Sequence, residues 1–202
     1  MNQDFNITNQ IELFFPTPIL FSTNENYAKE MLPIAKKYLE REDLLTYEWN
    51  YKNTYNPDQG LERFDDLKNF EKYVCNVGNN FLSSLGYDPK DSLRRAFIFT
   101  SEITRGNFHA PHAHPNCVLS GVFYLQVPEN SSRIIFHDPR PFRKYRIIPF
   151  KKQKEAHTTI FESEVFISPK PGLLLMWESW LDHEIEISNS DESRITLVFN
   201  LY

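Results

Sequence analysis

Cysteine is scarce in this sequence, and the two cysteines that occur do not suggest a disulfide-bonded protein. Cys75 and Cys117 stand alone in a chain of 202 residues, with no CxxC spacing. Two isolated cysteines make no disulfide framework, which favours a reducing, intracellular compartment. The length is enough for a full hydrophobic core, so we expect residues 1–202 to fold as a single domain.

Long apolar runs and an excess of positive charge are missing as well. No segment approaches the roughly twenty apolar residues that a membrane-spanning helix needs, and residues 1–10 lack the pattern of a secretory leader. The formal net charge is −5, so the chain has no overall basic footprint for binding a nucleic-acid duplex. We therefore expect a cytoplasmic protein without a membrane partner, and nucleic acid is not favoured as a partner.

One segment departs from this distribution of charge. Seven of the fifteen residues from Arg140 to Lys154 are arginine or lysine. A run of this kind is usually a solvated loop. The alternative is a lid that meets an acidic substrate, and the sequence alone leaves the role of residues 140–154 open.

The first ninety residues have the pattern of helices or mixed structure. Between residues 65 and 85 apolar side chains recur at intervals of three and four, Asp65 or Asp66 can cap the start, and Gly86 follows the end. A second helix is predicted from Glu25 to Arg41. We expect both helices to cover one face of a sheet.

From residue 94 onward the sequence changes to short runs rich in Ile, Val, Phe and Thr, with turn residues between them. Residues 46–60, which come earlier, predict an irregular connection. The predicted strands are Arg94–Ile103, Cys117–Val127, Arg133–His137, Thr158–Ser168, Gly172–Trp177, His183–Ser188 and Arg194–Tyr202. A series of short strands without intervening helices favours an antiparallel sandwich or barrel.

A pair of histidines two residues apart is the first candidate for a metal site. In an extended strand His112 and His114 would project from one face, while Ala113 would point to the other. Histidine is the commonest metal ligand among side chains, so this pair suits a metal ion. The alternative is a pair of ordinary hydrogen-bonding histidines in a loop bounded by Pro111 and Pro115.

A third histidine and an arginine follow on the last strands. His183 opens one strand, and Arg194 opens the next one eleven residues later. By strand parity Arg194 shares a face with Thr196, Val198 and Asn200. An arginine on the inward face of an apolar sheet is costly unless an anion pairs with it. If that anion is a ligand, the residues predict a metal site beside a pocket for a dicarboxylic acid.

Five blocks in a fixed order carry a resemblance to a known superfamily. They are His112–Pro115, Ser120–Leu125, Asp138–Arg140, Pro171–His183 and Arg194–Asn200, and they span roughly residues 95–202. In order and spacing the chain resembles the 2-oxoglutarate- and Fe(II)-dependent oxygenases. In particular it resembles the small, uncharacterised oxygenase-like proteins of marine bacteria and phages.

The resemblance implies a fold as well as an activity. The fold is mostly β with N-terminal helices, a double-stranded β-helix (jelly-roll, cupin-like barrel) buttressed by helices. Residues 94–202 would form the double-stranded β-helix core and residues 1–93 its helical or mixed support. The helical third would serve either as the surface of a homodimer or only as a buttress. If the protein is encoded by a phage, the cytoplasm is that of the host.

The resemblance also assigns roles to individual residues. The iron ligands would be His112, His114 and His183. Arg194 would pair with the far carboxylate of 2-oxoglutarate, Thr196 would support that carboxylate, and Tyr124 would reach the cosubstrate. The implied activity is a dioxygenase that uses Fe(II), 2-oxoglutarate and O2, and couples oxidative decarboxylation of 2-oxoglutarate to succinate with hydroxylation of a substrate. The substrate is a small molecule or a protein side chain that no motif identifies.

One residue departs from the pattern of the superfamily. Most of these oxygenases hold iron with two histidines and one carboxylate, but residue 114 is histidine instead of aspartate or glutamate. Three neutral ligands would leave the site one unit more positive. A carboxylate from elsewhere, with Glu102 and Asp138 as candidates, is the alternative third ligand.

Two other functions stay open. Gly106 followed by five residues and His-x-His fits the start of a cupin motif, as in a three-histidine dioxygenase or isomerase without cosubstrate. The glutamate expected after His114 is missing, however, and Arg194 would have no role. A non-catalytic barrel that serves as a binding module would explain the replacement of the carboxylate at residue 114.

Overall fold

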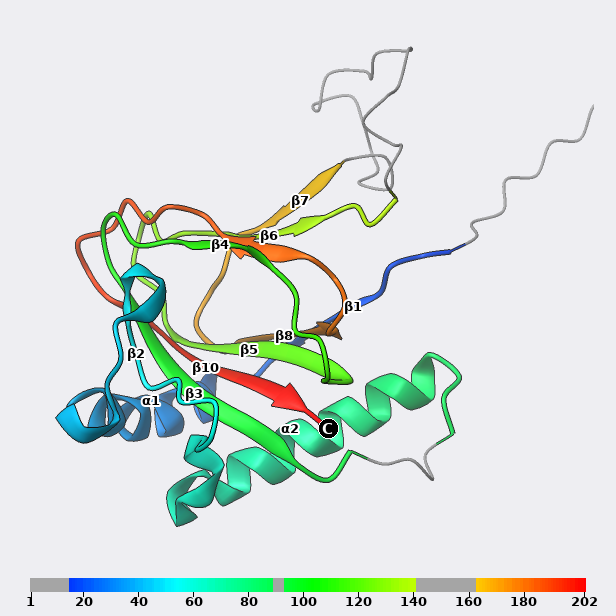
Figure 1. Cartoon of the computed structure of the whole chain (residues 1–202), viewed down its shortest axis with the longest axis horizontal. Coiled ribbons are helices and arrows are strands. Elements are labelled where there is room, and N and C mark those ends of the chain that lie inside the picture. Colours follow the sequence, from blue (N-terminus) through cyan, green and yellow to red (C-terminus); the bar gives the residue numbers. More distant parts are fainter. Residues whose placement is uncertain (1–14, 89–92, 141–162) are drawn as a thin grey trace, which may run out of the picture.

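The computed structural model describes residues 15–88, 93–140 and 163–202 as two antiparallel sheets and two long helices (Figure 1). The strands are β1 (Ile19–Thr23), β2 (Lys52–Asn53), β3 (Ala96–Ile103), β4 (His109–His112), β5 (Leu119–Gln126), β6 (Ile134–His137), β7 (Glu164–Ile167), β8 (Leu173–Glu178), β9 (His183–Ile185) and β10 (Arg194–Leu201). The helices are α1 (Glu25–Leu39) and α2 (Lys68–Ser84), and the 3₁₀ turns are η1 (Glu42–Leu44), η2 (Glu48–Asn50), η3 (Leu61–Arg63) and η4 (Asp65–Leu67). The expectation of a mostly β chain with N-terminal helices is confirmed.

The larger sheet has the strand order β1-β8-β5-β10-β3-β2, and the smaller one β4-β9-β6-β7. The smaller sheet lies above the larger one in Figure 1. The expected closed barrel is wrong, because no ladder joins the two sheets within the described ranges. Closure requires the edge strands of the sheets to pair. Here the N-terminal strands β1 and β2 occupy both edges of the larger sheet, β1 beside β8 and β2 beside β3, and the outer side of β2 meets an isolated bridge from Thr46 and not the smaller sheet.

Both helices lie on the outer face of the larger sheet, as predicted (Figure 1). The glycine expected after α2 is confirmed, since Gly86 has a φ of 92°, a conformation that glycine adopts without steric cost. The predicted aspartate cap is wrong, because η4 precedes α2 and no side chain caps the helix. Asp66 instead accepts hydrogen bonds from the Tyr38 hydroxyl and from Lys37 Nζ.

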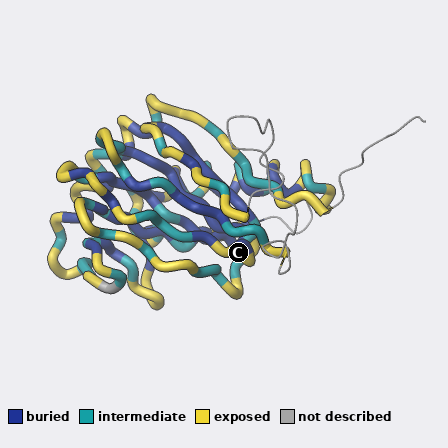
Figure 2. Tube along the Cα trace, turned by 90° about the horizontal axis from the view of Figure 1, so that it is seen from above, coloured by how far each residue is buried: buried dark blue, intermediate teal, exposed yellow. Residues whose placement is uncertain are grey.

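Strand alternation divides the larger sheet into two faces with different neighbours. On β10 the side chains of Ile195, Leu197, Phe199 and Leu201 pack in the core beneath the helices. The intervening residues, which begin with Arg194 and Thr196, face the smaller sheet and line a cavity. Buried residues run along the middle of the strands in Figure 2. The predicted parity of β10 is therefore confirmed, and it leaves one sheet face available for a site.

The predicted strands are confirmed with shortened or shifted ends, and the sequence prediction missed β1 and β2. The extended stretch proposed around His112 corresponds to β4, which ends at His112. Both cysteines are free, as expected. The basic segment lies outside the described residues from residue 141 onward, as does the start of the predicted strand Thr158–Ser168. In the part of the chain that the structure covers, no helix has the length and apolar character to cross a membrane.

Candidate active site

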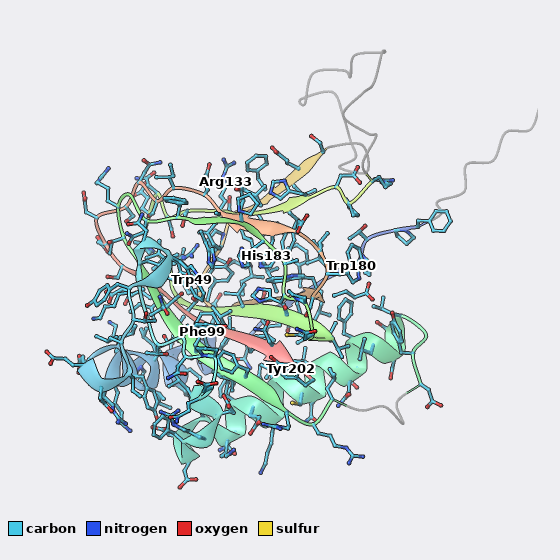
Figure 3. The ribbon with its side chains drawn as sticks, viewed as in Figure 1. Trp49, Phe99, Arg133, Trp180, His183 and Tyr202 are labelled. Atoms are coloured by element: carbon cyan, nitrogen blue, oxygen red, sulfur yellow. The ribbon has the colours of Figure 1, made fainter. Side chains whose placement is uncertain are left out.

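A cavity of about 460 Å³ opens between the two sheets, within the range of roughly 300–1,000 Å³ that small-molecule sites have. Its floor comes from the inward face of the larger sheet and its roof from β4 and β9. His183 lies between the sheets in Figure 3, with Trp49 and Phe99 to one side of it. Five of the predicted site residues line the cavity: His112, His114, His183, Arg194 and Thr196.

The three predicted histidines come together in this cavity. Their ligand atoms all lie within 4.8 Å of one another. His112 ends β4 and pairs directly with His183, the first residue of β9. β4 stops before His114, so the extended strand proposed for the pair reaches only His112. The chain turns there, and the backbone N–H of His114 donates to the carbonyl of Ser179 at 2.9 Å.

Backbone carbonyls determine which nitrogen two of these histidines offer to a ligand. Nδ1 of His112 lies 2.8 Å from the carbonyl oxygen of Ala110, and Nδ1 of His183 lies 3.0 Å from that of Leu181. A carbonyl only accepts hydrogen bonds, so each Nδ1 carries the proton and donates it. The lone pair available to a metal is then on Nε2. The hydrogen bond to the backbone also fixes the orientation of each ring, as it does for histidine ligands in metal sites.

Burial favours the neutral form of all three imidazoles. Burial and, as the second cause, the neighbouring His112 lower the pKa of His114 to about 4. Burial also lowers the pKa of His112. It lowers the pKa of His183 well below 6.5, with His112 as the second cause. Metal binding requires neutral imidazole, so the three side chains are in the ligand form at neutral pH.

The two carboxylates considered as a third ligand lie elsewhere. Glu102 is on the opposite side of β3 from Ser101, accepts from Ser193 Oγ, and its carboxylate lies 3.3 Å from Lys52 Nζ. Asp138 binds the Arg140 guanidinium at 2.7 Å and 3.0 Å. Among the described residues, no aspartate or glutamate joins the histidine group.

Arg194 is buried in the same cavity with only part of its hydrogen-bonding capacity used. Its side chain is 2% exposed. Nη1 donates to the carbonyl oxygen of Ser132 at 3.1 Å and to Ser132 Oγ at 3.0 Å. Nε has no partner within residues 15–88, 93–140 and 163–202. Burial lowers the pKa of Arg194, but a guanidinium stays protonated in proteins, so this cation lacks a full set of acceptors.

Two further predicted residues surround the arginine. Thr196 Oγ1 lies 2.8 Å from Ser101 Oγ, so two hydroxyl groups stand side by side next to Arg194 on the cavity floor. Tyr124 is fully buried, with the Arg194 guanidinium 5.7 Å from the centre of its ring. Its hydroxyl has no partner in the described part of the chain, and burial raises its pKa to about 12. Tyr124 lies outside the cavity lining, so its contact with a cosubstrate stays a prediction.

The sequence prediction missed a stack of rings that supports His112. The ring of His109 stacks on that of His112, with centroids 3.9 Å apart and planes 14° apart. The Tyr51 hydroxyl lies 2.8 Å from Nδ1 of His109, and Trp49 stacks on the same imidazole at 4.8 Å. Trp49 and Tyr51 belong to the irregular segment 46–60, where no periodicity indicates which side chains point inward.

The comparisons with known proteins agree with this geometry. Residues 98–200, about half of the chain, match the family described as "Putative 2OG-Fe(II) oxygenase". The non-heme alpha ketoglutarate dependent epimerase SnoN from nogalamycin biosynthesis is similar in fold, with a TM-score of 0.66 and 12% identity over 92% of this chain and 76% of that one. A prolyl-4-hydroxylase from Pseudomonas putida has a TM-score of 0.62 and 11% identity over 92% of both chains.

A prolyl 4-hydroxylase from Phytophthora capsici has a TM-score of 0.60 and 14% identity over 91% of this chain and 58% of that one. At such identities the likeness is one of fold. Among curated proteins none matches the sequence. The resemblance to proteins of marine bacteria and phages stays a prediction. The family match covers half of the sequence, so the chain belongs to the 2OG-Fe(II) oxygenase family.

Proposed function

We propose that this protein is a 2-oxoglutarate- and Fe(II)-dependent dioxygenase that hydroxylates a substrate while 2-oxoglutarate is converted to succinate. The fold would be a single domain of the double-stranded β-helix, or jelly-roll, type that is left open at its edges. The observation that carries the proposal is the meeting, in one cavity, of three neutral histidines and a buried arginine with an unused donor.

The residues present fit an iron ion. His112, His114 and His183 would hold it, and nitrogen ligands of this kind suit Fe(II). The bound iron would supply the chemistry with O2, while the protein contributes binding and orientation. The His183 side chain is 4% exposed and contacts Trp177, which limits access of water to the site.

The residues also fit the cosubstrate. Arg194 would bind the far carboxylate of 2-oxoglutarate through Nε, the donor that has no partner in the described chain. The hydroxyls of Thr196 and Ser101 lie beside it; one of them donates to the other, and the remaining O–H can donate to the same carboxylate. A dianion would also balance the positive charge that three neutral ligands leave on the metal. A solved complex of SnoN contains Fe3+ and alpha ketoglutarate, which supports this pair of ligands for a protein of similar fold.

One observation favours a second function. Within the described ranges the group consists of three histidines and no carboxylate. Three histidines are the ligand set of dioxygenases that need no cosubstrate. In that case Arg194 would be buried without a role, and the cost of burying an unpaired charge argues against it. A non-catalytic binding module has the same difficulty.

A turnover assay separates these functions. Protein, Fe(II), ascorbate and 2-oxoglutarate are incubated in air, and succinate is measured by mass spectrometry. We expect succinate above the protein-free background, lost in His183→Ala and kept in His137→Ala. His137 lies on β6 outside the metal group, so it is a matched histidine control. Metal bound at the three histidines without binding or consumption of 2-oxoglutarate would favour the function without cosubstrate.

A further inference from the structure

One end of the cavity is built from aromatic rings that contact one another. The centroid of the Tyr55 ring lies 4.6 Å from that of Trp49, 5.5 Å from Phe97 and 5.4 Å from Phe99. Trp49 and Phe99 are 6.2 Å apart, and all four side chains line the cavity. We call these four residues the aromatic wall. Its rings are in van der Waals contact, so they present a continuous apolar face.

Strand register separates the aromatic wall from the arginine. On the cavity floor Arg194 pairs with Ile103 and Thr196 pairs with Ser101. Further along the same strands Val198 pairs with Phe99, and Asn200 pairs with Phe97. Four residues from Arg194 to Val198 correspond to roughly 13 Å at the rise of a strand. A cosubstrate at Arg194 therefore leaves the aromatic end free for another molecule.

The described residues at the aromatic end offer no charged partner to a ligand. Apart from histidines, Arg194 is the charged residue of the cavity lining within the described part of the chain. A phosphate, carboxylate or ammonium group bound at the other end would be desolvated without an ion pair, which is costly. Asn200 provides a neutral contact there. Its Oδ1 accepts from Ser120 Oγ at 2.8 Å, so the amide N–H is the group that it can offer to a ligand.

We propose that the aromatic wall binds a neutral substrate with a flat ring system. The ring stacks on the wall, and an oxygen or nitrogen acceptor of the substrate takes the amide N–H of Asn200. This proposal rests on the proposed function, which assigns Arg194 to the cosubstrate and the histidines to iron. The binding contacts themselves need neither iron nor 2-oxoglutarate, so they can be measured separately.

The test uses three probes that share a ring and differ in charge: naphthol, naphthalenesulfonate and naphthylmethylammonium. Each is titrated calorimetrically into the metal-free full-length protein and into Arg194→Met, because Arg194 itself would attract the sulfonate. We expect naphthol to bind both proteins with similar Kd. In Arg194→Met both charged probes should bind at least roughly tenfold more weakly than naphthol, because their charges stay unpaired.

Ring removal gives the second arm of the test. Tyr55 contacts the other rings of the wall, and Tyr55→Ala should raise the Kd of naphthol roughly tenfold through lost ring contacts. Tyr47→Ala is the matched control, because Tyr47 is 67% exposed and lies outside the cavity lining. Phe97→Leu removes a ring of the wall while keeping an apolar side chain, and it replaces Tyr55→Ala if that variant does not fold.

Three results would overturn the proposal: equal binding of the three probes, tightest binding of the ammonium probe, or equal Kd values for Tyr55→Ala and Tyr47→Ala. The ammonium result would indicate a site for cations. Failure of the proposed function would look different, because naphthol binding would persist while no succinate forms.

Discussion

Replacing Arg194 with methionine should stabilise the ligand-free protein while it weakens binding of 2-oxoglutarate. Arg194 is 2% exposed, and the hydrogen bonds of its guanidinium in the described chain go from Nη1 to Ser132 alone. Without a bound anion, this buried charge therefore has no carboxylate partner among the described residues. Methionine fills a similar volume and carries no charge.

The size of both effects follows from these contacts. Exchange of buried ionic groups for apolar ones of similar volume stabilises proteins by up to roughly 4 kcal/mol. The two hydrogen bonds to Ser132 are lost at roughly 1 kcal/mol each, which leaves a net gain of up to roughly 2 kcal/mol. For a chain of this length that corresponds to a rise in Tm of up to roughly 8 °C. Charge-assisted hydrogen bonds contribute roughly 1.5–3 kcal/mol, so the Kd of 2-oxoglutarate should rise roughly 10- to 150-fold.

Thermal unfolding with and without 2-oxoglutarate measures both effects. Without ligand the Tm of Arg194→Met should exceed that of the unmodified protein. A saturating concentration of 2-oxoglutarate should raise the Tm of the unmodified protein and leave that of the variant nearly unchanged. Arg133→Met is the matched control, since Arg133 is a surface residue paired with Glu186 at 2.6 Å. A variant that is less stable without ligand and binds 2-oxoglutarate normally would refute the reasoning.

Three further predictions concern the histidines. His114→Asp should keep succinate formation because it restores a carboxylate ligand, whereas His114→Ala should lose it; equal loss in both would show that residue 114 is not a ligand. Tyr51→Phe removes the hydroxyl that lies 2.8 Å from Nδ1 of His109. Because His109 then supports the ring of His112 less firmly, we expect the affinity for a divalent metal, measured by chelator competition, to fall roughly tenfold. An unchanged affinity would mean that the stacked rings do not position His112. Burial lowers the pKa of His114 from 6.5 to about 4, so below pH 6.5 the unfolded chain takes up protons that the metal-free folded state does not bind. The free energy of unfolding in urea should therefore fall as the pH drops from about 6.5 towards 4, less steeply in His114→Gln, and a flat profile would contradict the burial of this imidazole.

The sequence predicted the elements whose pattern repeats along the chain. Alternation on β10 correctly placed Arg194 and Thr196 on the inward face, because burial on both sides of a strand keeps the register fixed. The resemblance to the 2-oxoglutarate-dependent oxygenases implied that His112 and His183 would meet, and they do. His114 also lies in the site, but strand alternation does not place it there. β4 ends at His112, and beyond it the backbone N–H of His114 donates to the carbonyl of Ser179.

What the sequence could not predict depends on irregular backbone. Trp49 has a φ of 63° inside η2, a conformation that no residue pattern in the segment 46–60 indicates. Ser132 comes from the loop before β6 and meets Arg194 only through tertiary packing. Asp66 looked like a helix cap, but Tyr38 and Lys37 from α1 compete for its carboxylate. Contacts between segments distant in the chain therefore decide these positions.

The absorption spectrum of the protein with Fe(II) and 2-oxoglutarate, recorded without oxygen, tests the central claim most directly. We predict a charge-transfer band in the visible region, because iron at the three histidines and 2-oxoglutarate at Arg194 would be in direct contact. The band should disappear in His183→Ala, weaken strongly in Arg194→Met and persist in His137→Ala. If the unmodified protein shows no band, the three histidines and Arg194 do not form a site for iron and 2-oxoglutarate.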